Sequence, residues 1–262
     1  MKQLIVDEVL TTLAQRREDI QGQWATPTGT ATRHFVVDGF LPVPRATDAF
    51  AAFPRDGQGF YTRENFREKK RTSALLSEYD PLLADITYAL QDPRVVEAIG
   101  TLTGMDHLEP DPDLSRGGLS MMFKGDYLNP HIDNSHDAKR NRYRRLNILY
   151  YVSPNWQLAN GGNFELWNEK RTTPKAIVSA ANRLVVMETT KYSWHSVSEV
   201  QVDLPRCCIS NYYYSAKSPD GNDYYHVTAF DGRPDEQLKK GISIMDNALR
   251  GAVSKITGKS RG

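Results

Sequence analysis

Two histidines and an aspartate stand at a spacing that suits a metal site. His131 and Asp133 lie two residues apart in HIDNSH, and His195 follows much later in YSWHSVSEV. This order is typical of the 2-His-1-carboxylate facial triad, which holds Fe(II) on one face and leaves the other positions open. Alternate side chains of a strand share a face, so His131 and Asp133 should point inward together, with His195 supplied by another strand. We therefore predict that these three residues are catalytic metal ligands.

An arginine and a tyrosine are placed to hold a cosubstrate beside that metal. Arg206 opens the strand-like run RCCISNYYYS after the distal histidine. Its planar, permanently charged guanidinium group suits the far carboxylate of an iron-bound 2-oxoglutarate. Burying that carboxylate without a partner would be costly. On the run RLNILYYV, strand parity places Tyr151 and Asn147 on one face. If that face points inward, the Tyr151 hydroxyl can donate a second hydrogen bond, and the alternative is a core aromatic with its hydroxyl at the rim. A single His-x-Asp arises readily by chance, and the ordered set of features carries the prediction.

The composition is that of an ordinary globular protein. The chain has 262 residues, 25% of them charged, and a formal net charge of +1, which gives no argument for binding nucleic acid or an acidic membrane. The start MKQLIVDEVL carries acidic residues and is not expected to be a signal peptide, and no apolar run is long enough to span a bilayer. The adjacent cysteines, Cys207 and Cys208, exclude a disulfide framework and a cysteine zinc site, and favour a reducing, cytoplasmic setting.

Local signals predict helices in the first part of the chain and strands after it. Helices are expected at 3–19, 81–91 and 93–103, the last two beginning at Asp-Pro pairs that combine a cap with a proline at the first helical position. The run REKKR at 67–71 is expected on a solvated helix face, with contact to the substrate as the alternative. Short β-rich runs separated by turn signals then predict a sandwich or a jelly roll. A final helix near 234–256 has one apolar stripe, expected to pack outside the barrel, with a homodimer interface as the alternative.

The stretch from about 117 to 230 resembles the prolyl 4-hydroxylase-like branch of the Fe(II)/2-oxoglutarate-dependent oxygenases. The resemblance is carried by GDYLNPHIDNS, LYYVSPNWQLANGGNFELW, NRLVVMETTKYSWHSV and PRCCISNYYYS. It implies a mainly β fold with flanking helices, in which a double-stranded β-helix (jelly roll) forms the catalytic core over 117–230. Residues 1–116 would be a helical and mixed part packing on that core, and 231–262 a C-terminal helix, all in one structural unit.

The same resemblance implies cofactors and cosubstrate contacts. The cofactors are Fe(II), 2-oxoglutarate and O2, with ascorbate as an optional reductant, and the far carboxylate falls to Tyr151 and Arg206. Cys208 stands where related oxygenases often carry a serine, so a third carboxylate contact would depend on a thiol. The upstream cosubstrate tyrosine has no clear counterpart, and Tyr127 is the candidate to replace it. Asp133 keeps the carboxylate that a halogenase lacks, which disfavours halogenation.

Strand parity and position in the chain suggest five residues of a substrate pocket, namely Asn134, His136, Arg145, Asn147 and Trp167. Of these, His136 is expected at the mouth of the pocket or on the surface. The pattern predicts an enzyme, a 2-oxoglutarate-dependent dioxygenase, that by default hydroxylates an unactivated C–H bond of a small molecule (amino acid, sugar or natural-product intermediate). Peptidyl proline is the alternative substrate, and desaturation, ring closure or epimerisation stay open as outcomes.

An alternative of another class is a metal-binding jelly roll without oxygenase activity, such as a cupin-like isomerase or a sensor. That reading leaves Arg206 unexplained. Nucleic-acid demethylation of the AlkB type is disfavoured, because position 212 is a tyrosine where that type carries a second arginine.

Overall fold

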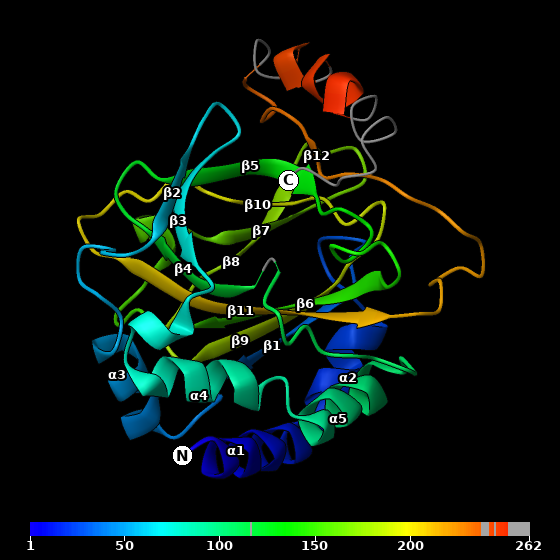
Figure 1. The fold of residues 1–262 in the computed structure, drawn as a ribbon. Helices are drawn as coiled ribbons and strands as arrows, with labels where there is room; N and C mark the ends of the chain where they lie inside the picture. Colours follow the sequence, from blue (N-terminus) through cyan, green and yellow to red (C-terminus); the bar gives the residue numbers. More distant parts are fainter. Residues whose placement is uncertain (116, 237–240, 244, 251–262) are drawn as a thin grey trace.

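One antiparallel sheet, curled so that its two halves face each other, forms the body of the molecule (Figure 1). The computed structural model describes residues 1–115, 117–236, 241–243 and 245–250. Along the main path the strand order is β1-β9-β6-β11-β4-β3-β5-β10-β7-β8, while β12 pairs with β5 and β2 with β3. The strands are β1 (His34–Asp38), β2 (Tyr61–Glu64), β3 (Glu68–Ser73), β4 (Gly118–Met122), β5 (Tyr127–Ile132), β6 (Tyr143–Tyr151), β7 (Phe164–Trp167), β8 (Pro174–Ile177), β9 (Arg183–Glu188), β10 (His195–Val197), β11 (Arg206–Ser215) and β12 (Ala229–Phe230).

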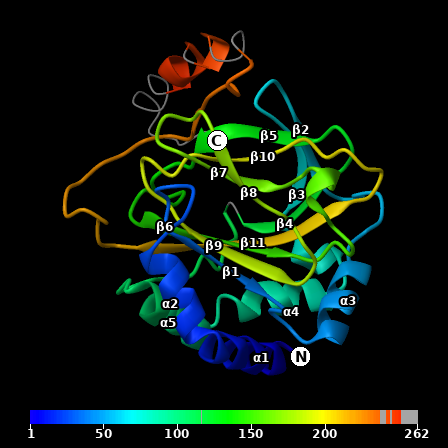
Figure 2. The same ribbon diagram turned by 180° about the vertical axis from the view of Figure 1, so that it is seen from behind.

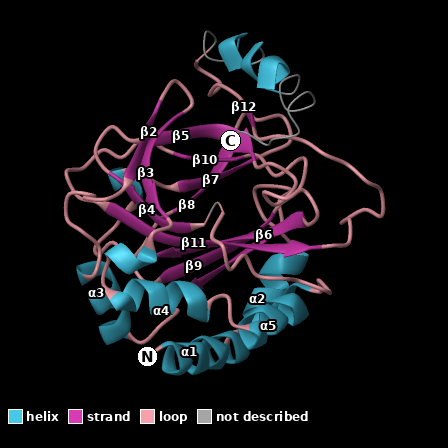
Figure 3. Cartoon of the chain, in the orientation of Figure 1, coloured by secondary structure: helices cyan, strands magenta, loops and turns pink. Residues whose placement is uncertain are grey.

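Strand β3 joins the two halves of the sheet. It pairs with β4 through Arg71 and Met121, and with β5 through Lys69 and Tyr127. One layer holds β1, β9, β6, β11 and β4, and the other holds β5, β10, β7 and β8. Figure 3 shows these layers as magenta strands one above the other. The arrangement is the double-stranded β-helix, or jelly roll, that the sequence predicts.

Helices cover the outer face of the larger layer. They are α1 (Lys2–Gln15), α2 (Arg17–Ala25), α3 (Val43–Ala51), α4 (Pro81–Ala89) and α5 (Pro93–Thr103), with short 3-10 turns at Leu76–Glu78 and Leu158–Asn160. Apolar side chains such as Val9 of α1 and Ile99 of α5 join Ile148 of β6 in the main hydrophobic core. Seen from behind, the helices lie on this same side of the sheet (Figure 2). Because side chains alternate, the residues on either side of Ile148 face the interior of the curl.

The predicted Asp-Pro helix starts are confirmed. The Asp92 carboxylate accepts a hydrogen bond from the Arg94 N–H at 3.1 Å, and Asp80 caps α4 in the same way. A capping carboxylate satisfies N–H groups that have no partner inside the helix. Helix α5 ends at Gly104, whose φ of 66° is a left-handed conformation that glycine adopts without strain.

Three helix predictions need correction. Residues 67–71 lie largely in strand β3, because pairing with β2 along one edge and with β4 and β5 along the other decides the conformation of this charged run. The helix expected at 3–19 is divided into α1 and α2 at Arg16. The helix expected near 234–256 lies partly outside the described residues, and its described part, 241–243 and 245–250, exposes Ile242 and Met245 rather than packing them on the barrel.

No helix in the described part of the chain has the length and apolar character needed to cross a membrane.

Candidate metal and cosubstrate site

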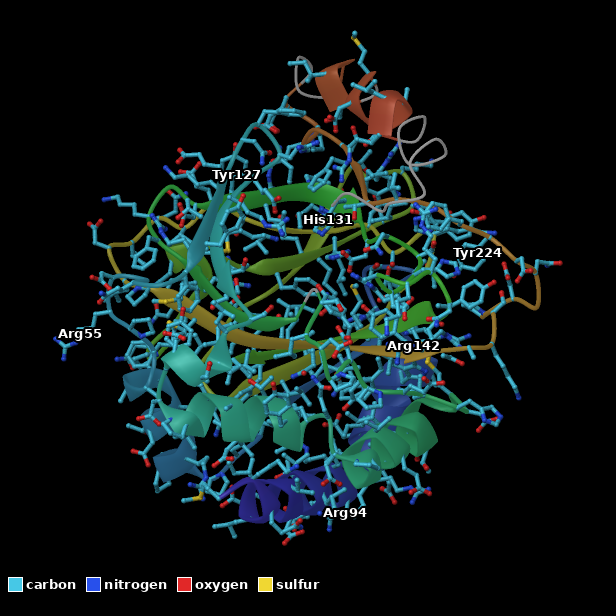
Figure 4. All side chains as sticks on the ribbon, in the orientation of Figure 1. Arg55, Arg94, Tyr127, His131, Arg142 and Tyr224 are labelled. Atoms are coloured by element: carbon cyan, nitrogen blue, oxygen red, sulfur yellow. The ribbon has the colours of Figure 1, made fainter. Side chains whose placement is uncertain are left out.

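Three metal-ligating side chains meet inside the curl of the sheet. His131 lies near the end of β5, Asp133 follows that strand, and His195 begins β10 directly opposite His131. Figure 4 labels His131 beside β5. All three side chains are buried, and their ligand atoms lie within 4.8 Å of one another. Nε2 of His131 is 3.8 Å from Oδ1 of Asp133, and Nε2 of His195 is 3.7 Å from Oδ2. One ion at the centre can contact all three residues.

Backbone carbonyls orient both imidazoles. Nδ1 of His131 is 3.0 Å from the carbonyl oxygen of Asn129, and Nδ1 of His195 is 2.9 Å from that of Ser193. Because a carbonyl only accepts hydrogen bonds, each Nδ1 carries the proton and each Nε2 turns its lone pair toward the centre. Hydrogen bonds of this kind accompany histidines that bind metals.

The charges around the triad favour the form that binds a cation. Burial, followed by the neighbouring His195, lowers the pKa of His131 to about 3, and burial also lowers the pKa of His195. Burial opposes ionisation of Asp133, but Arg144 and the two histidines outweigh it, so the pKa of this carboxyl lies below its ordinary value. The site therefore presents two neutral imidazoles and one carboxylate near neutral pH, as a metal requires.

Arg144 of β6 holds Asp133 from the other side. Its Nη1 lies 3.1 Å from Oδ2 of Asp133, and its Nη2 donates to Oδ1 of Asn134 at 2.9 Å. The guanidinium carbon is 4.0 Å from the centre of the Tyr212 ring. This buried arginine therefore fixes the orientation of the carboxylate, and it brings the predicted pocket residue Asn134 next to the triad.

Arg145 was predicted to be a pocket residue, but its neighbour Arg144 is the arginine that faces the site. Leu146 of β6 pairs with Tyr213 of β11, but the next pair is Arg144 with Tyr214, so Arg145 is the extra residue of a β-bulge. An extra residue reverses the alternation of side chains along its strand. Arg144 consequently faces the triad, whereas Arg145 is only half-buried and does not line the cavities beside it.

A cavity of about 120 Å³ leads from the triad to Arg206. Nε of this buried arginine donates to the carbonyl oxygen of Gly162 at 2.5 Å and to Oγ of Ser179 at 3.0 Å. Its guanidinium carbon lies 4.8 Å from the centre of the Tyr151 ring. The Tyr151 hydroxyl is buried without a hydrogen-bond partner in the described part of the chain, and burial raises its pKa, so it stays a proton donor. A buried cation beside an unpaired hydroxyl fits a carboxylate group.

The inward faces of β6 and β11 form the wall of this inner cavity. The residues are Asn147, Leu149 and Tyr151 of β6, and Arg206, Cys208, Ser210 and Tyr212 of β11. Within each strand these positions differ by two, so strand parity places their side chains on one face. Burial raises the pKa of Cys208 to about 12, so its side chain is a neutral thiol. The Asn147 carbonyl oxygen is buried and has no hydrogen-bond partner among the described residues.

A second cavity of about 320 Å³, the outer cavity, lies on the other side of the triad and reaches the exposed Tyr61. Strand β3 supplies Glu68, Lys70 and Thr72 to its wall. This run was predicted to be a solvated helix face, with substrate contact only as the alternative, so the individual residues were not named. The one local signal was their spacing of two, which puts them on one face of a strand.

Two predicted pocket residues lie elsewhere. Trp167 ends β7, where Leu166 faces the interior, so its own ring lies on the opposite face and lines a separate surface cavity with Trp194 and Tyr224. His136 is buried rather than exposed, with its ring centre 4.3 Å from that of Tyr143 and its Nδ1 2.8 Å from Oγ of Ser135. Neither residue lines the cavities beside the triad.

Tyr127, the candidate for the upstream cosubstrate tyrosine, also lies outside both cavities. It begins β5, and its hydroxyl donates to the carbonyl oxygen of Asn65 at 3.1 Å. Figure 4 shows it apart from His131, toward the β2–β3 hairpin. Its position points to a structural contact between β5 and that hairpin.

Residues 117–214 match the family model described as the 2OG-Fe(II) oxygenase superfamily. All three members of the triad, together with Tyr151 and Arg206, lie inside the matched segment. The match confirms the predicted resemblance to the iron- and 2-oxoglutarate-dependent oxygenases. It also confirms iron and 2-oxoglutarate as the predicted cofactors.

Several proteins to which the chain is similar are prolyl hydroxylases. Over 77 residues the chain is 34% identical to the prolyl 3-hydroxylase OGFOD1 of Mus musculus, a match that covers 27% of this chain and only 14% of that protein. A prolyl 4-hydroxylase from Pseudomonas putida has a similar structure, with a TM-score of 0.56, 15% identity, and coverage of 78% of this chain and 98% of that one. A prolyl hydroxylase from Trichoplax adhaerens, solved with a hypoxia inducible factor peptide fragment, gives a TM-score of 0.50, 16% identity, and coverage of 77% and 92%. At such identities the two structures show a shared fold.

Proposed function

We propose that this chain, which carries the core of a 2OG-Fe(II) oxygenase, hydroxylates an unactivated C–H bond of a small molecule such as an amino acid, a sugar or a natural-product intermediate. The observation that supports this most is one buried cavity with three metal-ligating side chains at one end and Arg206 at the other. His131, Asp133 and His195 would hold Fe(II). When bound, Fe(II) with 2-oxoglutarate and O2 supplies the oxidation of the substrate C–H bond.

Arg206 and Tyr151 would bind the far carboxylate of 2-oxoglutarate. The hydrogen bonds from Nε of Arg206 to Gly162 and Ser179 hold the guanidinium in place before the cosubstrate arrives. The terminal nitrogens then remain to donate to a carboxylate, and the unpaired Tyr151 hydroxyl is a further donor. Cys208 borders the same space as a neutral thiol, which is only a weak donor.

The walls of the site would limit water and orient the substrate. The imidazole of His131 stacks on Phe230 of β12 with 5.3 Å between ring centres, which covers one side of the triad. Leu128 of β5 borders both cavities. A substrate entering the outer cavity would therefore reach the metal position along a partly apolar wall.

The first test is anaerobic titration of Fe(II) and 2-oxoglutarate, followed by the visible charge-transfer band of the chelate. The wild-type protein should give the band, and His195→Ala should abolish it. His107→Ala is the matched control, because His107 is exposed and lies far along the chain in the loop after α5. Absence of a band from wild-type protein at saturating iron would refute the proposed cofactor site and favour the non-oxygenase jelly roll.

Peptidyl proline is the second candidate substrate. It is favoured by the names of the relatives, a mouse prolyl 3-hydroxylase and prolyl hydroxylases of similar fold. Succinate release from 2-oxoglutarate should be compared in the presence of proline-containing peptides, free amino acids and sugars. Stimulation by peptides alone would replace the small molecule by peptidyl proline and leave the cofactor site unchanged.

A further inference from the structure

The wall of the outer cavity is unusually rich in positive charge. Among the described residues, the lining includes five cationic side chains and only two carboxylates. The cationic residues are Arg63, Arg67, Lys70, Arg144 and Arg250, and the carboxylates belong to Glu68 and Asp133. The whole chain is almost balanced, with 33 basic and 32 acidic residues. The excess at this cavity is therefore a local feature, and a cavity of one sign attracts ligands of the other.

We propose that the substrate carries an anionic group, a carboxylate, phosphate or sulfate, and that Lys70 binds this group where the outer cavity meets the triad. The proposal rests on the proposed function, since it names the substrate class of that same site. Lys70 and Thr72 line both the outer and the inner cavity, together with His131 and Asp133. A ligand bound at Lys70 would thus lie beside the metal position, at the triad end of the inner cavity, whose other end is at Arg206.

The sheet holds Lys70 in this position. Strand β3 pairs with β2 along one edge, where Lys70 lies opposite Arg63. Along the other edge it pairs with β5 at Glu68 and Lys69 and with β4 from Arg71 onward, so Lys70 lies on a strand fixed at both edges. A charged side chain presented by a paired strand is oriented more tightly than one on a loop. The neighbouring Lys69 points to the other face of β3 and pairs there with Glu64 at 3.1 Å.

The carboxylates near Lys70 leave positive charge for a ligand. Nζ of Lys70 lies 2.9 Å from Oε2 of Glu68, but Oε1 of the same carboxylate is 3.7 Å from Arg63. One carboxylate is therefore shared between two cations. Arg67 is paired with Asp246 at the rim at 2.7 Å. Asp133 is paired with Arg144, yet a metal at the triad would share the charge of this carboxylate.

A purely structural role explains this arrangement poorly. Glu68 is buried, with 7% of its surface exposed, and its partner Lys70 is largely buried, with 21% of its side chain exposed. A buried ion pair is costly to desolvate and often contributes little to stability compared with apolar residues. An anionic ligand in the cavity would give Lys70 a second partner and would use a charge that the fold itself does not need.

The test uses sulfate as the probe and Lys70→Met as the variant, with Lys69→Met as the matched control on the opposite face of β3. Sulfate binding to the anaerobic Fe(II)–2-oxoglutarate complex is measured by calorimetry. Wild type and Lys69→Met should bind sulfate alike, and Lys70→Met should bind it about tenfold to a hundredfold more weakly, as expected for a lost hydrogen bond between charged groups. Equal binding by Lys70→Met, or none by wild type, overturns the proposal.

The charge-transfer band separates this proposal from the proposed function. Lys70→Met should keep the band and the wild-type affinity for 2-oxoglutarate. If it instead loses affinity for 2-oxoglutarate and keeps sulfate binding, Lys70 serves the cosubstrate, and the proposal fails while the oxygenase assignment stands. If wild type gives no band but the protein without Fe(II) and 2-oxoglutarate binds sulfate in a Lys70-dependent way, the proposed function fails and the anion site remains.

A second arm identifies the kind of anion. Candidate substrates are offered as matched pairs of free acid and primary amide, and as phosphorylated and unphosphorylated forms, with succinate release as the readout. The charged member should give at least about tenfold higher kcat/KM with wild type, and Lys70→Met should remove this preference mainly through KM. Equal turnover of charged and neutral members refutes an anionic substrate.

Discussion

Replacing Arg206 by methionine should weaken 2-oxoglutarate binding far more than it weakens the fold. Methionine keeps much of the side-chain length but removes the charge and all donors. Nε of Arg206 is engaged by Gly162 and Ser179, while the sulfur of Met122, 3.6 Å from Nη1, is a weak acceptor. The terminal nitrogens thus have little to bind until a carboxylate arrives. Leaving a buried carboxylate without its charged partner costs about 3–5 kcal/mol.

That cost corresponds to a dissociation constant for 2-oxoglutarate raised roughly a hundredfold to a thousandfold or more. The measurement is an anaerobic titration of the Fe(II) protein with 2-oxoglutarate, using the charge-transfer band. Arg206→Lys keeps the charge without the planar fork and should fall between wild type and Arg206→Met. The control is Arg183→Met, because Arg183 pairs with Asp38 at 2.6 Å, away from both cavities.

Thermal unfolding of the metal-free proteins shows whether Arg206→Met still folds. If the variant is folded and its affinity for 2-oxoglutarate falls by less than about threefold, the effect is no larger than that of a surface ion pair. Arg206 would then not bind the far carboxylate, and the carboxylate site would have to lie elsewhere in the inner cavity.

Three further outcomes are expected. Gly162→Ala should weaken 2-oxoglutarate binding in the same titration, because its φ is +60° and an added Cβ would lie 2.8 Å from Cδ of Arg206. Arg144→Met should weaken Fe(II) binding, measured by titration, whereas Arg145→Met should not, because only Arg144 contacts Asp133. The pKa of His131 is lowered from its ordinary value of 6.5 to about 3, so below pH 6.5 the unfolded chain takes up a proton that the folded chain does not. The free energy of unfolding of the metal-free protein should therefore fall as the pH drops from 6.5 to 5, with a slope for this residue that approaches about 1.4 kcal/mol per pH unit, and denaturant titration should show a smaller slope for His131→Gln. An unchanged slope in that variant, equal effects of the two arginine variants, or tight cosubstrate binding by Gly162→Ala would contradict the respective argument.

The chemistry of the inner cavity was predictable because its signals are local. His131 and Asp133 share a strand face by parity, and the alternation of Arg206, Cys208 and Ser210 along β11 has the same origin. The caps of α4 and α5 are equally local, since Asp and Pro act within one turn. In each case the relevant physics involves residues close together in the chain.

The choice between Arg144 and Arg145 could not be made in the same way. It depends on a bulge between β6 and β11, whose position is set by the partner strand and leaves no mark in the sequence of β6. Trp167 was wrongly predicted to line the pocket for a similar reason. The inward face of β7 is decided by the packing of Phe164 and Leu166 in the apolar cluster inside the curl of the sheet. Parity gives two faces to a strand, but tertiary packing decides which face is inside.

Strand β3 was missed because its composition contradicts its conformation. A run of Glu, Lys and Arg has low strand propensity, and charged residues on neighbouring positions are more common on solvated helices. Here pairing with β4 and β5 fixes the strand, and its charged inward residues face a cavity instead of an apolar core.

The position of β3 also explains why the family resemblance identifies the cofactors and not the substrate. The segment that matches the oxygenase family begins at residue 117, whereas β3 ends at Ser73. The proposed iron ligands and Arg206 belong to the matched core, but Lys70 reaches the same space from a strand outside it. If Lys70 selects an anion, substrate choice in this chain depends on a segment that can vary without disturbing the iron or 2-oxoglutarate contacts. Exchange of residues 68–72 should then alter substrate preference while the charge-transfer band is retained.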